Sequence, residues 1–135
     1  MRCEVTLCQS PRGDLIGEAA ILQRLHHVIY VDCLNSFDPH RLYRLAGDES
    51  CLERIHICRP FTLYQLREAV KYKLEAAIQE TKSEAVLVSD PTVFEVDGEV
   101  GGEEYHHIMG DILGRLEALT RDYMLVTLLG VRCLG

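Results

Sequence analysis

Apolar residues gather in short runs along the chain, and the segments between the runs repeat apolar residues every three or four positions. The runs 27–33 (HVIYVDC), 54–59 (RIHICR) and 84–90 (EAVLVSD) predict three strands, and the first and third have the continuous apolar character of strands buried on both faces. Residues 4–9 (EVTLCQ) predict a short strand before them. The last segment, 123–135 (YMLVTLLGVRCLG), predicts one or two more strands.

The intervening segments have the spacing of amphipathic helices. We expect helices from Asp14 to about Leu25, over 38–47, around 63–78 and around 108–119, and an acidic loop over 91–104. The helix over 38–47 opens with an Asp-Pro pair and closes with a glycine, which are typical start and stop residues. The apolar residues that carry the spacing of the last two helices are Leu63, Leu66, Val70, Leu74, Ile78, Ile108, Ile112, Leu116 and Leu119.

Strands that alternate with helices predict an α/β domain with a mostly parallel sheet covered on both faces. At 135 residues, without a repeat or a linker, the chain is expected to form one domain, 1–135. Ligands of such sheets bind beyond the carboxyl ends of the strands. The strand ends at 8–14, 32–37, 90–95 and 127–130 are therefore the candidate functional segments.

Composition and charge narrow the classes of function. Apolar residues make up 47% and charged residues 26% of the chain, as in globular proteins. No apolar run approaches the roughly 18 residues of a membrane span, and the N-terminus lacks a secretory apolar segment, so we expect an intracellular protein. The 14 Lys and Arg against 21 Asp and Glu give a net charge of −7. Autonomous nucleic-acid binding normally needs a basic surface, so the charge argues against it.

Neither the cysteines nor the histidines form a metal-binding motif. The six cysteines contain no CxxC pair, and Cys8, Cys33 and Cys58 fall in or beside predicted strands, so we expect free thiols. The pairs His26–His27 and His106–His107 are adjacent in sequence, and neighbouring side chains of a helix diverge by about 100°, which makes a poor chelate. The sequence therefore predicts no metal site.

Several segments, in order, resemble the RecA/RadA family of recombinases. Residues 28–42 (VIYVDCLNSFDPHRL) are similar to the family's V-I-Y-I-D-T-E-G-T-F-R-P-E-R-L, and 54–62 (RIHICRPFT) to N-I-x-x-A-R-A-F-N. Residues 85–95 (AVLVSDPTVFE) resemble its Walker B strand, L-L-I-V-D-S-V-x-x-L-F-R. The last helix and 122–129 (DYMLVTLL) resemble R-L-A-x-x-Y-N-x-x-V-V-V-T-N-Q. The matching positions include Tyr30, Asp32, Phe37, Pro39, Arg41, Leu42, Arg59 and Phe61.

This resemblance spans essentially the whole chain and implies a three-layer αβα RecA-like P-loop NTPase core. The family's phosphate loop, G-x-x-x-x-G-K-[ST], then falls on 8–15. Its first glycine is replaced by Cys8, its second is Gly13, its lysine is replaced by Asp14 and its magnesium-binding hydroxyl by Leu15. A carboxylate in place of the lysine repels phosphate, and an alkyl side chain cannot hold magnesium.

The remaining catalytic positions implied by the resemblance are also altered. The glutamate that activates water corresponds to Leu34, and the glutamine that senses the γ-phosphate corresponds to Leu129. Asp90, at the Walker B position, is the one remaining candidate for magnesium, although an aspartate before a proline also suits a turn. The family's first DNA-binding loop contains arginine, whereas 95–104 has five acidic residues and no basic one. The resemblance therefore implies a pseudo-ATPase that does not use ATP or magnesium.

We expect such a chain to act as a protein-binding subunit that assists homologous recombination and DNA repair. The implied partners are recombinase-like or SWIM-type proteins in a hetero-oligomer, in the cytoplasm or nucleoid of a prokaryote or in the nucleus of a eukaryote. Two alternatives stay open: an ATPase completed by a partner, with Arg12 meeting a phosphate, and a KaiC-like regulatory protein without a DNA role. The candidate partner-binding residues are Tyr64, Val70, Leu74, Ile78 and Val126.

Asp14 also suggests a structural hypothesis. At the start of the first helix its carboxylate is expected to cap free amides and to lie at the positive end of the helix dipole. The chain would then fill its own anion site with its own anion.

Overall fold

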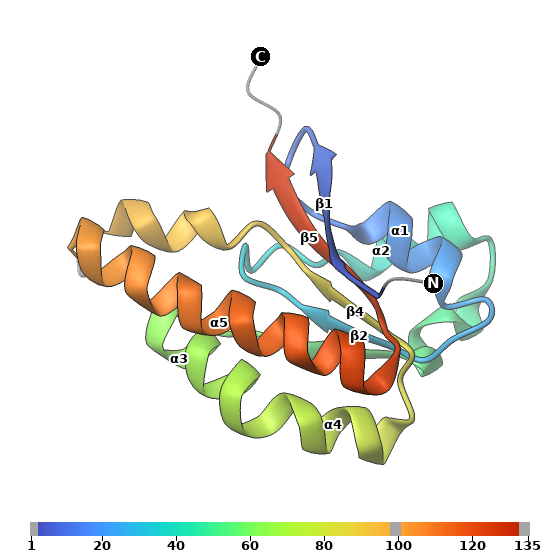
Figure 1. Ribbon diagram of the computed structural model, residues 1–135. Coiled ribbons are helices and arrows are strands. Elements are labelled where there is room, and N and C mark those ends of the chain that lie inside the picture. The colour runs from blue at the N-terminus through green and yellow to red at the C-terminus, as the bar shows by residue number, and fades with distance from the viewer. Residues whose placement is uncertain (1–2, 98–100, 133–135) are drawn as a thin grey trace.

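The computed structural model describes residues 3–97 and 101–132, and these form an α/β unit around a five-stranded parallel sheet (Figure 1). The strand order is β1-β5-β4-β2-β3, and every neighbouring pair is parallel. The strands are β1 (Val5–Ser10), β2 (Val28–Val31), β3 (Ile55–Cys58), β4 (Ala85–Val88) and β5 (Val126–Arg132). This confirms the predicted fold class, which is compatible with a three-layer αβα core of the RecA-like type.

The helices lie in two layers, one on each face of the sheet (Figure 1). One layer contains α1 (Ile16–Leu22) and α2 (Pro39–Ala46), and the other contains α3 (Leu63–Glu68), α4 (Leu74–Thr81) and α5 (Gly102–Tyr123). Strand β2 shows why both layers are needed. Val28 and Tyr30 pack toward α1 and α2, whereas Ile29 and Val31 pack toward the opposite layer, so the strand has no solvent-facing side.

The segment predicted as one helix around 63–78 is a continuous helical rod with a π turn, Ala69–Lys73, between α3 and α4. Its buried residues Leu66, Val70 and Leu74 recur every four positions. In an ideal α-helix a four-residue repeat drifts around the axis by about 40° per step. A wider π turn absorbs that drift, which keeps the apolar row on the sheet.

Two other boundaries differ from the sequence-based expectations. The acidic segment 91–104 is not a simple loop, because 3-10 turns occupy Pro91–Asp97 and helix α5 begins at Gly102. Buried Tyr105 anchors that first turn of α5, in which Glu103 and Glu104 lie near the positive end of the helix dipole. A further 3-10 segment, Glu49–Arg54, precedes β3. The described part of the C-terminal region forms one strand, β5, within the one or two that were predicted. Glu99 and Cys133 lie outside the described residues.

The described cysteines are free, and Cys33 and Cys51 are buried, in agreement with the expectation of structural thiols. Within the described part of the chain, no helix combines the length and the apolar character needed to cross a bilayer.

Candidate functional site

The loop between β1 and α1 folds onto the carboxyl ends of β4 and β5. The carbonyl of Gly13 accepts a hydrogen bond from the amide of Asp90, with an N···O distance of 3.0 Å. Gly13 has a φ of 76°, a left-handed conformation that favours glycine. The loop is thus held to the strand ends by its own backbone.

Little space remains between this loop and the strands. A Cβ atom added to Gly130 of β5 would collide with the carbonyl oxygen of Gly13. A Cβ atom on Gly13 would lie 2.7 Å from Cγ of Arg132 and 2.8 Å from Cβ of Asp90. The two glycines therefore permit a close approach of loop and sheet that any side chain would prevent.

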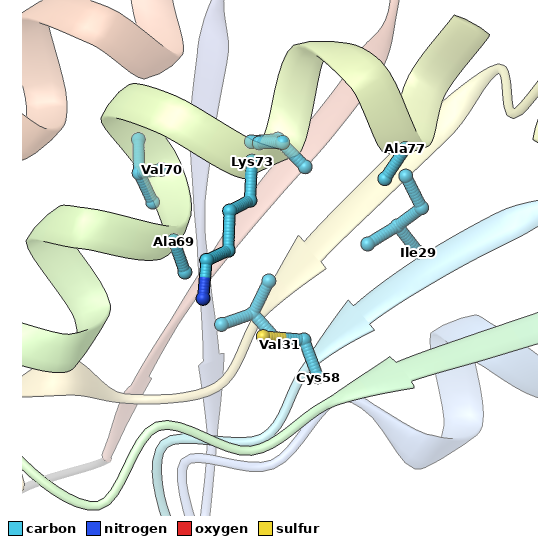
Figure 2. A pocket seen from close by; sticks show the side chains of 8 residues that line it. Ile29, Val31, Cys58, Ala69, Val70, Lys73 and Ala77 are labelled. Carbon is cyan, nitrogen blue, oxygen red and sulfur yellow. The ribbon is translucent and has the colours of Figure 1, made fainter. Parts of the chain in front are cut away.

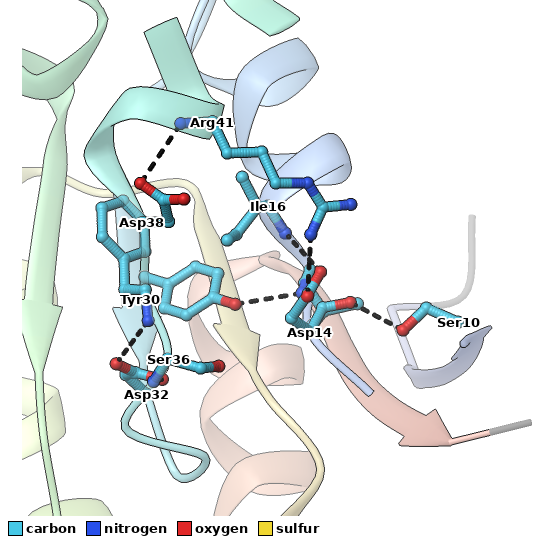
Figure 3. Close-up of polar contacts among 10 residues, drawn as sticks. Ser10, Asp14, Ile16, Tyr30, Asp32, Ser36, Asp38 and Arg41 are labelled. Carbon is cyan, nitrogen blue, oxygen red and sulfur yellow. Dashed lines mark hydrogen bonds and ion pairs between the residues drawn. The ribbon is translucent and has the colours of Figure 1, made fainter. Parts of the chain in front are cut away.

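The amides of Gly13, Leu15 and Ile16 donate to acceptors within the chain, and Figure 3 shows the bonds to the Tyr30 hydroxyl and the Asp14 carboxylate. Gly13 donates to the carbonyl of Ser10 at 3.3 Å, and Leu15 donates to the hydroxyl of Tyr30 at 3.0 Å. The Ser10 hydroxyl in turn donates to the carbonyl of Asp14 at 2.9 Å. A phosphate-binding nest needs successive amides directed at one anion, and these amides are directed elsewhere.

Three aspartates follow β1, β2 and β4, and each is buried and paired with an arginine. Asp14, Asp32 and Asp90 are 6%, 0% and 2% exposed. The guanidinium-to-carboxylate N···O distances are 3.0 Å for Arg41–Asp14, 3.1 Å for Arg59–Asp32 and 3.3 Å for Arg132–Asp90. Buried carboxylates are stable only when paired and hydrogen-bonded, so these pairs join the loops at the strand ends.

Asp14 was expected to cap the first helix, and its carboxylate contacts both that helix and Arg41 of α2. The N-cap of α1 is Leu15, which makes no side-chain capping bond, and Asp14 precedes it. The Asp14 carboxylate receives the amide of Ile16 only at 3.5 Å, the outer limit of a hydrogen bond, while Arg41 of α2 donates to it at 3.0 Å (Figure 3). The capping hypothesis holds only in part: the Asp14 carboxylate accepts one free amide of α1 at the limit of hydrogen bonding, and its shorter contact is the ion pair with Arg41 of α2.

Asp32 fixes the loop after β2. Its two carboxylate oxygens accept the amides of Ser36 at 3.1 Å and Phe37 at 3.0 Å, in addition to the guanidinium of Arg59. The ring of Phe37 packs edge-on against Tyr30, with centroids 5.0 Å apart. Asp32 thus organises a turn and a core contact at the end of β2.

Asp90 is engaged through both of its oxygens. Oδ1 accepts the amide and hydroxyl of Thr92 at 2.9 and 2.6 Å, and Oδ2 accepts the amide of Arg132 at 3.1 Å and its Nε at 3.3 Å. Burial alone would raise the pKa of Asp90, but the hydrogen bonds from Thr92 and Arg132 outweigh it and lower the pKa below its usual value. The Walker B-like aspartate is therefore built into a turn and an ion pair, and no group of three metal-binding side chains occurs among the described residues.

The other predicted site residues lie in the same region but carry no polar side-chain chemistry. Leu15 is fully buried, and Leu129 is 7% exposed in the core beneath α5. Leu34 is half-buried, and its amide donates to the Ser89 hydroxyl at 3.2 Å, which joins the ends of β2 and β4. Cys8 pairs with Gly130 within the sheet, and burial raises the pKa of its thiol. The structure thus brings the four predicted strand ends together.

Sequence reasoning gave no role to the three arginines or to the Tyr30 hydroxyl. Arg41, Arg59 and Tyr30 were matched to the RecA-like pattern, but Arg132 was not. A signal was present, since three aspartates at the ends of apolar strands require cationic partners. Which arginine meets which aspartate is a property of the tertiary fold.

An open depression of about 420 Å³ lies beside the loop, between β1 and α2. It is lined by Ser10, Pro11, Arg12, Asp14, Asp38, Arg41 and Arg44. Asp14 is paired with Arg41, and Asp38 caps α2 by accepting the amides of His40 and Arg41. The exposed Arg12 and Arg44 give this depression a positive balance in a chain of net charge −7.

A second, apolar cavity of about 80 Å³ lies between the π turn and strands β2 and β3 (Figure 2). Its lining includes Ile29, Val31, Cys58 and the alkyl stem of Lys73. Binding pockets for drug-sized ligands typically measure about 300–1,000 Å³, so this cavity suits one apolar side chain and not a nucleotide.

The predicted partner-binding residues divide into two groups. Val70, Leu74 and Ile78 are 1%, 5% and 3% exposed and pack in the core, so their prediction as a partner surface is wrong. Tyr64 and Val126 are 40% and 43% exposed, and the Tyr64 hydroxyl donates to Glu104 at 2.6 Å. The apolar face of this helical segment, which was predicted to bind a partner, covers the sheet instead.

Comparison of the chain with known protein families gives no match, and comparison with curated proteins gives none either.

Proposed function

We propose that this chain is a catalytically inactive RecA-like subunit that binds other proteins and assists homologous recombination and DNA repair. The RecA/RadA resemblance of the sequence motivates the functional class. The inactive state is argued from the strand-end cluster, which we define as Asp14, Asp32 and Asp90 with Arg41, Arg59 and Arg132.

One observation supports the proposed lack of ATPase activity most directly. Gly13 lies on the strand ends, and its carbonyl accepts a hydrogen bond from the amide of Asp90. The backbone that would have to wrap a phosphate is in contact with the sheet. The adjacent Asp14 presents a carboxylate, already paired with Arg41, where the RecA-like pattern has a lysine. An incoming polyanion would have to displace these contacts and meet a like charge.

Within the strand-end cluster, the arginines balance the negative charges of the aspartates. Each of its three carboxylates has a guanidinium within 3.3 Å, so the cluster has no uncompensated buried charge that calls for magnesium. This arrangement supports a role in holding the fold together. We infer that the chain acts by binding proteins at its surface and not by binding a nucleotide at the strand ends.

The exposed apolar residues favour protein binding over catalysis. Leu7 on the edge strand β1 and Val126 at the start of β5 are 66% and 43% exposed. At the other edge of the sheet, Phe61 follows β3 and is 61% exposed. Edge strands with exposed apolar side chains are sites where other chains add to a sheet, so β1 is the first candidate for contact with a partner.

The test is affinity isolation of the tagged full chain from its native cells, with a Leu7→Glu variant as the matched control. The proposal expects recombinase-like or other repair proteins to accompany the wild type, and expects Leu7→Glu to reduce their recovery without unfolding the chain. Recovery of no repair protein with the wild type would contradict the proposed role in recombination.

A second candidate function is an ATPase completed by a partner subunit. The depression lined by Arg12, Arg41 and Arg44 favours it, because guanidinium groups are strong phosphate ligands. It still requires a water-activating group, and Leu34 cannot provide one. Hydrolysis of Mg-ATP by the isolated complex, lost in an Arg12→Ala and Arg44→Ala double variant, would support this candidate instead.

A further inference from the structure

Two histidines from neighbouring strands face each other at the amino end of the sheet, the end opposite to the strand-end cluster. His27 immediately precedes β2, and His56 is the second residue of β3. Since Ile29 is the register partner of His56, His27 lies one diagonal step away on the same face of the sheet. The main chain of two paired strands therefore holds both imidazoles in place.

Nδ1 of His27 and Nε2 of His56 are 3.1 Å apart, so one nitrogen donates a hydrogen bond to the other. The two rings are nearly parallel, with an interplanar angle of 17° and centroids 5.4 Å apart. Both residues are half-buried, which leaves one side of the pair open to solvent. This pair is formed by the sheet, unlike the His26–His27 and His106–His107 pairs, which are only adjacent in sequence.

The separation of these two nitrogens matches a shared metal ion. Imidazole nitrogens bind Zn²⁺ at about 2.0–2.1 Å, so two of them on one ion lie about 2.9 Å apart at a right angle and about 3.3 Å apart at a tetrahedral angle. The observed 3.1 Å falls between these values. Metal binding requires each ring to turn so that its lone pair points at the ion rather than at the other nitrogen. The nitrogen that donates the present hydrogen bond must also pass its hydrogen to the other nitrogen of its own ring.

We propose that His27 and His56 form a two-histidine chelate for a borderline divalent cation of the Zn²⁺ or Ni²⁺ type. Imidazole is a preferred ligand of these ions. Since no third metal-binding side chain joins them among the described residues, water fills the other coordination positions. Metal binding replaces the hydrogen bond between the rings and links β2 to the edge strand β3 through side chains.

The protonation state of His56 suits this role. Burial, followed by the neighbouring His27, lowers the pKa of His56. A lowered pKa keeps the imidazole of His56 neutral at pH 7, and neutral imidazole is the form that binds metals. The alternative is a hydrogen-bonded histidine pair without a metal function, and the two differ in their response to added Zn²⁺.

The experiment is a calorimetric titration of the reduced full chain with Zn²⁺, repeated on His27→Gln, His56→Gln and two controls. His40→Gln, an exposed histidine of α2, controls for the loss of an imidazole, and Cys58→Ser controls for binding by the thiol two residues beyond His56. We expect one equivalent of Zn²⁺ to bind the wild type, and each chelate variant to lose at least about tenfold in affinity. Both controls should bind as the wild type does.

An NMR readout separates metal binding from a general change in fold. On addition of Zn²⁺, the ring signals of His27 and His56 should shift together while those of His40 stay fixed. The proposal is overturned if the wild type binds no Zn²⁺ at millimolar concentration, or if binding survives unchanged in both His27→Gln and His56→Gln. Neither result bears on the proposed function, because the role in recombination is motivated by the RecA/RadA resemblance and the inactive state rests on the strand-end cluster at the opposite end of the sheet.

Discussion

The carbonyl of Gly13 and the amide of Asp90 share a hydrogen bond of 3.0 Å, which fastens the loop after β1 to the end of β4. In a phosphate-binding loop the backbone would stand away from the sheet to enclose an anion. Here Gly130 of β5 leaves room for that close contact. Asp14 and Asp90 flank this bond, and their ion pairs with Arg41 and Arg132 help to hold the loop on the sheet.

Gly130→Ala tests how closely the loop approaches the sheet. The added methyl would collide with the Gly13 carbonyl, so we expect the free energy of unfolding to fall by about 1–3 kcal/mol. Urea denaturation monitored by circular dichroism measures this. Gly114→Ala is the control: it is exposed on α5, an added Cβ atom there would have no neighbour within 4 Å, and the substitution should instead stabilise by about 0.5–1 kcal/mol. A Gly130→Ala variant as stable as the wild type would contradict the close approach.

Substitutions of Asp14 test its ion pair with Arg41. Asp14→Asn should lower the free energy of unfolding by about 1–2 kcal/mol, a modest cost because the Arg41 side chain is 33% exposed and solvent weakens the pair. Asp14→Lys should cost more, since it places two cations together, and it should not create ATP binding. The charge-swapped variant Asp14→Lys, Arg41→Glu should recover part of the loss. An Asp14→Lys chain of undiminished stability would refute the pairing.

Tyr30→Phe removes the acceptor of the Leu15 amide at the start of α1. Because this amide is buried, we expect a loss of about 1–3 kcal/mol in the free energy of unfolding. Burial also raises the pKa of Tyr30 well above its usual value, so its hydroxyl is neutral at pH 7. Tyr72→Phe, at a residue that is 74% exposed, should change stability by less than about 0.5 kcal/mol. Equal effects of the two substitutions would argue against a structural role for the Tyr30 hydroxyl.

The lowered pKa of Asp90 predicts that the free energy of unfolding depends on pH in the acidic range. Its pKa in the folded chain is lowered, so its ionised form stabilises the fold above the unfolded-state pKa of about 3.9, and this contribution is lost as pH falls through the folded value. The difference in unfolding free energy between the wild type and Asp90→Asn should therefore be largest near neutral pH and shrink below about pH 4. Denaturation curves over this pH range measure it, with the exposed Asp122→Asn as a control for charge loss. A difference that grew on acidification would contradict the assigned hydrogen bonds.

The sequence was sufficient for the fold class because strand and helix periods differ so clearly. The run 85–88 has no polar face, which together with the alternation of strands and helices favours a parallel sheet covered on both sides. The π turn at Ala69–Lys73 was not predicted, although the four-residue repeat of Leu66, Val70 and Leu74 contained the signal. The same row was offered as a partner surface, and only the position of the helix on the sheet shows that it is core.

The site was predictable in part. The sequence located Asp14, Asp32 and Asp90 at strand ends, where parallel strands bring them together. It could not assign their arginine partners, because Arg41 and Arg132 come from elements 27 and 42 residues away from the carboxylates they meet. The same limit applies to His27 and His56, which meet only through the register of β2 and β3.

The most direct test of the central claim is calorimetric titration of the purified, monodisperse chain with Mg-ATP, followed by a hydrolysis assay on the same sample. We predict no binding heat at millimolar nucleotide and no hydrolysis, because the loop after β1 rests on the strand ends and Asp14 opposes phosphate. Saturable Mg-ATP binding with a hydrolysis rate that is abolished by Asp90→Ala would contradict the claim that the chain is a pseudo-ATPase.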